Sequence, residues 1–177
     1  MHAYQPLWPD DRHDWEPPSP ADFTFNDALD VGAFAAFDPL VTWRTWPEVW
    51  HLDGRGRWRC CSKGSSLDSV RRFAERPSEM LGCRAVDTGQ RCPDNWVIIE
   101  PRHPWSDDRY EVNEGDAAAF LSLRSSLASL GVNLLDALVF HQEHRWWSLH
   151  ELTTGTTAWT FCSDRPAARS TRRGRRA

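Results

Sequence analysis

The sequence predicts an α+β fold, with a mostly antiparallel sheet of hairpins and two main helices packed on it. Three observations predict it: short β-rich segments separated by turn residues, an Asp-Gly turn between two of them, and two segments with apolar residues at helical spacing. We expect a flexible arm in residues 1–22, a single domain in residues 23–163 and an Arg-rich disordered tail in residues 164–177. A chain of 177 residues is long enough for one such domain.

The first elements follow from prolines and capping residues. Five prolines interrupt the first 20 residues, and proline blocks helices and withholds a backbone donor, so the arm is expected to be extended or disordered. Residues 23–37 show loosely helical apolar spacing with Asn26 or Asp27 as caps, which predicts a short helix or turn.

Residues 42–63 predict a β-hairpin. Asp53-Gly54 lies between two apolar segments, and this dipeptide supplies the positive φ that tight hairpin turns require. A helix capped by Ser65 or Ser66 and ended by the next proline is expected to follow.

The second half predicts further strands around one long helix. We expect a short strand at residues 96–99 and a helix at residues 116–130, which has an apolar face and a glycine at its end. The last part predicts a meander of three strands, at residues 134–141, 145–152 and 157–162.

Composition indicates a reducing compartment and no membrane span. Five cysteines, two of them adjacent, fit reduced thiols better than a disulfide framework. No apolar run approaches the roughly 18 residues of a transmembrane helix, and the first residues lack the pattern of a signal peptide. We therefore expect a soluble cytoplasmic protein without a cofactor.

Positive charge is concentrated near the end of the sequence. Residues 165–177 contain six arginines and no acid, whereas residues 1–164 carry 15 basic and 25 acidic side chains. Guanidinium groups bind phosphates with little geometric demand, so the tail predicts contact with nucleic acid or an acidic surface. The alternative is a solubilising end. The arginines expected to bind are Arg169, Arg172, Arg173, Arg175 and Arg176.

Eleven tryptophans supply candidate anchors for a protein partner. Trp146 and Trp147 are adjacent in a predicted strand, so they face opposite sides and one of them is expected at the surface. Arg145, Arg57 and Arg59 adjoin tryptophans, and the tryptophan between Arg57 and Arg59 is expected in the core. These features predict a non-catalytic interaction protein.

An alternative prediction is a small hydrolase or nuclease. Histidine and glutamate residues gather around one predicted hairpin, and imidazole with carboxylate serves acid–base catalysis or metal binding. Solvated turn residues and cross-strand pairs explain the same pattern. The residues of this cluster are His141, Glu143, His144, His150 and Glu151.

Two weaker alternatives remain. Cys83, Cys92 and His103 form a candidate metal set, although eight residues separate the two cysteines and zinc knuckles have two to four. The acidic residues also allow an inhibitor that mimics nucleic acid, although a net charge of −10 over residues 1–164 is only moderate. The residues in question are Asp10, Asp11, Asp14, Glu16, Asp107, Asp108, Glu111, Glu114 and Asp116.

Overall fold

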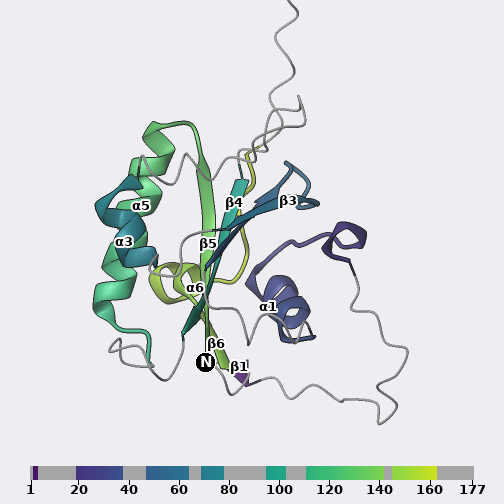
Figure 1. The fold of residues 1–177 in the computed structure, drawn as a ribbon, viewed down its shortest axis with the longest axis horizontal. Coiled ribbons are helices and arrows are strands. Elements are labelled where there is room, and N and C mark those ends of the chain that lie inside the picture. The colour runs from purple at the N-terminus through teal and green to yellow at the C-terminus, as the bar shows by residue number, and fades with distance from the viewer. Residues whose placement is uncertain are drawn as a thin grey trace, which may run out of the picture.

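The fold is α+β, as predicted, with one mixed sheet and helices on both of its faces (Figure 1). The structure is a computed structural model. It describes residues 2–3, 19–37, 47–63, 69–77, 95–102, 111–141 and 145–162. The predicted tail and most of the predicted arm lie outside these residues.

The sheet has the strand order β1-β6-β5-β4-β2-β3. Four of the five strand pairs are antiparallel, which confirms the mostly antiparallel prediction, and β4 and β5 are parallel. The strands are β1 (His2–Ala3), β2 (Glu48–Leu52), β3 (Trp58–Lys63), β4 (Asn95–Arg102), β5 (Asn133–His141) and β6 (Arg145–Ser148).

Two apolar cores lie on opposite faces of the sheet. α3 (Val70–Glu75), α5 (Glu114–Ser129) and α6 (Leu149–Thr154) cover one face, and α1 (Ala28–Phe37) covers the other (Figure 1). α5 buries Phe120, Leu123 and Leu127, whose spacing places them on one side of a helix. A short 3₁₀ helix, Pro20–Asp22, precedes α1. None of the described helices is both long and apolar enough to span a membrane.

Side-chain caps explain where the helices begin. Asn113 accepts hydrogen bonds from the backbone N–H groups of Gly115 and Asp116, and Asp116 accepts one from the Asn113 N–H, so α5 starts with a capping box. Asp27 accepts a hydrogen bond from the Asp30 N–H at the start of α1. α3 is capped by Ser69, and the expected caps at residues 65–66 lie outside the described residues.

The predicted hairpin is confirmed as β2 and β3. Asp53 Oδ1 accepts hydrogen bonds from the backbone N–H groups of Arg55 at 2.8 Å and Arg57 at 3.0 Å. The expected positive φ lies at Gly56 (φ +77°) and not in the Asp53-Gly54 dipeptide, and glycine adopts this left-handed conformation without steric cost. The turn is therefore held by one carboxylate and one glycine.

The predicted three-stranded meander is wrong after its first turn. β6 ends at Ser148, where Ser148 Oγ accepts a hydrogen bond from the Glu151 N–H and starts α6 in place of a longer strand. Residues 157–162 form no strand, and only Ala158 makes an isolated bridge, with Asp27. Hydrogen bonds to side chains of other elements replace a strand ladder in this segment.

Gly56→Ala is expected to cost about 2–3 kcal/mol of unfolding free energy. A Cβ there would lie 2.2 Å from the Phe25 carbonyl oxygen, in addition to the strain of positive φ. Gly155→Ala is the matched control, because Gly155 has φ +75° with nothing near its Cβ position, and should cost about 1 kcal/mol. Urea unfolding of both variants measures the difference, and equal losses would contradict the role given to the Phe25 contact.

Candidate nucleic-acid interface

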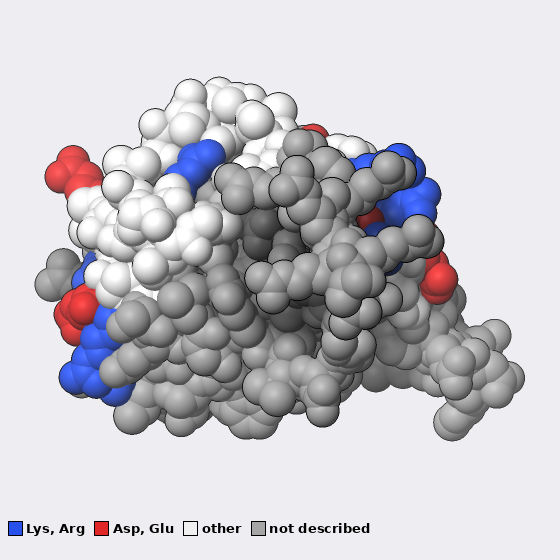
Figure 2. All heavy atoms as spheres, turned by 90° about the horizontal axis from the view of Figure 1, so that it is seen from above, with Lys and Arg blue, Asp and Glu red and all other residues white. Residues whose placement is uncertain are grey.

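Three arginines of the β2–β3 hairpin lie at one end of the sheet. Arg55, Arg57 and Arg59 are exposed, and we call them the basic end. Among the described residues, no acidic side chain forms an ion pair with Arg55 or Arg57, so both guanidinium groups are available to an anion. Figure 2 shows basic side chains gathered on the right, the side on which β3 lies.

The turn that carries these arginines is held by Asp53. Burial opposes ionisation of Asp53, but the backbone N–H groups of Arg57 and Arg55 and the Arg59 guanidinium together lower its pKa. Arg59 also forms an ion pair with Asp53, while half of its side chain stays exposed. The carboxylate thus orients the turn while neutralising only one of the three arginines.

Residues 156–162, which we call the C-terminal strap, cross to the same end of the sheet. Asn133 Nδ2 donates to the Thr160 carbonyl at 2.9 Å, and the Asn95 side chain bonds both the N–H and the carbonyl of Cys162. Asn95 and Asn133 begin β4 and β5, and Asn95 pairs with Leu52, the last residue of β2. The strap therefore ends where the β2–β3 turn begins.

The Arg-rich segment starts close to this point. Phe161 lies against the turn, because a Cβ on Gly56 would be 3.2 Å from Phe161 Cζ. Arg165 follows Cys162 by three residues, which span at most about 11 Å of extended chain. Arg169, Arg172, Arg173, Arg175 and Arg176 lie outside the described residues.

The two adjacent tryptophans face opposite sides of β6. Trp146 is 2% exposed and lies so close to α1 that a Cβ on Gly32 would be 2.3 Å from its ring. Trp147 is half-buried on the other face, beside the exposed Arg145. Of the two rings, Trp147 presents the larger surface to solvent.

Of the predicted histidine cluster the structure describes His141, His150 and Glu151, and it places His141 apart from His150. The backbone N–H of His150 donates to Asp136. His141 lies five residues beyond Asp136 on β5, about 17 Å away along the strand. His150 accepts a hydrogen bond from Arg124 at Nδ1 (3.0 Å) and donates one from Nε2 to the Ala158 carbonyl (3.1 Å). Both ring nitrogens of His150 thus form hydrogen bonds within the fold.

The remaining predicted residues are half-buried, exposed or outside the described part of the chain. Glu151 is half-buried at the first turn of α6, and Glu111 and Glu114 are exposed. The described residues contain no group of three metal-ligand side chains. Glu143, His144, Cys83, Cys92, His103, Asp10, Asp11, Asp14, Glu16, Asp107 and Asp108 lie outside the described residues.

A buried carboxylate in the middle of β5 holds three segments together. Asp136 accepts hydrogen bonds from Ser148 Oγ (2.6 Å), the His150 N–H (2.9 Å), the Ala137 N–H (2.7 Å) and Trp159 Nε1 (3.3 Å). Burial raises its pKa to about 6, although these four donors favour the charged form. The group joins β5, the start of α6 and the strap.

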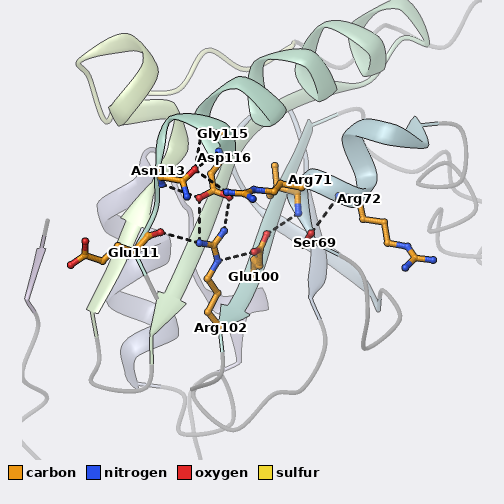
Figure 3. A network of polar contacts seen from close by, with 10 residues as sticks. Ser69, Arg71, Arg72, Glu100, Arg102, Glu111, Asn113, Gly115 and Asp116 are labelled. Atoms are coloured by element: carbon orange, nitrogen blue, oxygen red, sulfur yellow. Dashed lines mark hydrogen bonds and ion pairs between the residues drawn. The ribbon is translucent and has the colours of Figure 1, made fainter. Parts of the chain in front are cut away.

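A second buried network lies at the opposite end of the sheet, where β4 ends (Figure 3). Arg102 is 8% exposed and donates to Glu100 and, through both terminal nitrogens, to Asp116. Arg71 Nε donates to Asp116 at 2.7 Å, and Glu100 accepts the Val70 N–H at 2.8 Å. The network pairs two carboxylates with two guanidinium groups, so its charges balance. Its residues come from α3, β4 and α5, and their contacts join these three elements.

Sequence reasoning did not select Arg55, Asp136 or the Glu100–Arg102 pair as site residues. Arg55 stands inside the Asp-Gly-Arg-Gly turn, so its exposure follows from the predicted hairpin. Asp136 is the only charged residue between Leu134 and Phe140, a signal for a buried, hydrogen-bonded acid.

Comparison with known proteins returns no similarity: no family model, no curated protein sequence and no solved structure matches this chain.

Proposed function

We propose that this protein is a non-catalytic binding protein that engages nucleic acid through the basic end together with residues 165–177. The observation that supports it is the course of the C-terminal strap, which ends at Cys162, beside the sheet end that carries Arg55 and Arg57 and three residues before Arg165. The basic end and residues 165–177 together contain nine arginines, in a chain whose first 164 residues are net acidic.

This arrangement favours a polyanion over an isolated anion. Each guanidinium group that contacts a phosphate releases a condensed counterion, so affinity grows with the number of contacts and falls with salt. Repulsion from the acidic remainder directs the polyanion to the basic end. The turn supplies arginines in an ordered conformation, which lowers the entropy cost of binding.

Arg55→Ala with Arg57→Ala is expected to weaken binding to an oligothymidylate of about 20 nucleotides. Loss of two phosphate contacts should also reduce the slope of log K against log salt by about 1.4. Fluorescence anisotropy over a salt series measures both quantities. Arg59 is kept, because its ion pair with Asp53 supports the turn.

The matched control is Arg72→Ala with Arg145→Ala, which removes the same charge from exposed positions. Arg145 pairs in the sheet with His141, at the end opposite the hairpin turn. Equal losses for both double variants would contradict a localised site. Deletion of residues 165–177 should lower the salt slope by about 4 for six arginines, and an unchanged slope would exclude that segment from the interface.

A protein partner at Trp147 is the second candidate function. The half-buried Trp147 ring lies beside the exposed Arg145, and tryptophan and arginine are the residue types enriched among interface anchors.

The exposed Cys162 thiol, which forms no disulfide, supports the proposal that the protein works in the cytoplasm.

A further inference from the structure

Partly exposed aromatic side chains border the basic end. Phe23 is 41% exposed, and Trp58 and Phe161 are half-buried against the core beneath α1. We name these three residues the aromatic rim. Building on the proposed function, we propose that the ligand is single-stranded nucleic acid, whose bases stack on the aromatic rim while its phosphates bind the arginines.

Backbone pairing places the rim next to the arginines. Thr24 forms an antiparallel bridge with Arg57, and the Phe25 N–H donates to the Gly56 carbonyl at 2.8 Å, so Phe23 lies one residue from the bridge. Phe161 reaches the same turn from the strap. The rim thus gathers three segments that are far apart in the sequence.

Strand alternation separates rings from charges across β3. Trp58 packs toward the core beneath α1, so Arg57 and Arg59 project to the other side of the strand. A single strand that crosses this edge meets guanidinium groups on one side and aromatic rings on the other. This division matches a chain with phosphates on one side and bases on the other.

Phe23, the most exposed ring of the rim, is held in its orientation by neighbouring aromatic rings. The Phe23 ring centroid lies 5.2 Å from that of Phe34 and 6.3 Å from that of Phe25, and the Phe23 and Phe25 planes differ by 25°. Little side-chain entropy remains to be lost when a base stacks on it. In a duplex the base faces are stacked on one another, whereas in a single strand they are accessible.

Phe23→Leu tests the inference, because leucine keeps apolar bulk and removes the aromatic face. We expect this variant to bind oligothymidylate about tenfold more weakly, with an unchanged salt slope and unchanged affinity for a DNA duplex of the same length. Leu29→Ala is the control, since Leu29 is 42% exposed on α1 and is not part of the rim. Thermal unfolding verifies that each variant is folded.

Three outcomes separate this inference from the proposed function. If Phe23→Leu binds oligothymidylate like the unmodified protein while Arg55→Ala with Arg57→Ala weakens it, the arginines bind phosphates without stacking and only the single-strand inference fails. Tighter binding of the duplex, or of polyglutamate, than of oligothymidylate also overturns it. If neither variant changes binding of any of these polyanions, the proposed function fails as well.

Discussion

Replacement of Asp116 by alanine is expected to lower the free energy of unfolding by about 3–5 kcal/mol. Asp116 is fully buried and accepts hydrogen bonds from Arg102, Arg71 and the Asn113 N–H. Its removal would leave the Arg102 guanidinium, itself 8% exposed, with Glu100 as its remaining carboxylate. A buried charge that loses a partner is costly because the desolvation penalty is no longer offset.

Chemical unfolding of Asp116→Ala and of Arg71→Ala measures this effect against a matched control. Arg71 contacts the same carboxylate from a side chain that is 43% exposed, so its loss should cost no more than about 1 kcal/mol. Similar losses for both variants would show that burial of Arg102 does not determine the energy of the network.

Acid should remove the stabilising contribution of Asp116 to this network. Burial opposes ionisation of Asp116, but hydrogen bonds from Arg102, the Asn113 N–H and Arg71 lower its pKa. A carboxyl group with a lowered pKa contributes stability above its unfolded value near 4, and this contribution is lost as pH falls through the folded value.

Replacement of Asp136 by alanine is expected to cost about 3–4 kcal/mol at pH 7. Four donors would lose their acceptor in the core, among them Ser148 Oγ and Trp159 Nε1. Asp136→Asn is the milder variant, because its amide keeps one acceptor oxygen and removes the charge. Urea unfolding at pH 7 ranks the two, and a larger loss for the asparagine variant would contradict this account.

The pH dependence of Asp136 has the opposite sign to that of Asp116. A folded pKa of about 6, against an unfolded value near 4, means that the protonated form stabilises the fold below pH 4 and that this contribution disappears as pH rises through 6. The unmodified protein should therefore lose about 2.5 kcal/mol relative to Asp136→Asn between pH 4 and pH 7.

The comparison with Asp136→Asn is needed because His150 titrates nearby with the opposite effect. Burial, assisted by the charge of Arg124, lowers the pKa of His150, so its contribution is present above pH 6.5 and is lost in acid. Both proteins contain His150, and the difference between them isolates Asp136. A difference that stays constant with pH would contradict the raised pKa.

Local signals in the sequence predicted the elements that depend on neighbouring residues. Asp53-Gly54 marked the hairpin turn, and the apolar face of residues 116–130 marked α5 to within two residues at its start. The predicted strand at residues 145–152 failed because Ser148 acts as a helix cap, and a serine in an apolar segment gives no sign of that choice.

The candidate site depended on contacts that no local pattern contains. Exposure of Arg57 and Arg59 followed from strand alternation, as did the separation of Trp146 from Trp147. The bonds from Asn95 to Cys162 join residues 67 apart in sequence, so the meeting of the strap with the hairpin turn was visible only in three dimensions.

The C-terminal strap also sets an order for folding during synthesis. Its partners Asn95, Asn133 and Asp136 are made before it, so β4, α5 and β5 emerge from the ribosome while the Trp159 bond to Asp136 cannot yet form. Until then Asp136 lacks one of its four donors, and Asn95 and Asn133 lack their bonds to the strap. The two Asn95–Cys162 hydrogen bonds, which hold the strap at the hairpin end of the sheet, can therefore form only after residue 162 has been made.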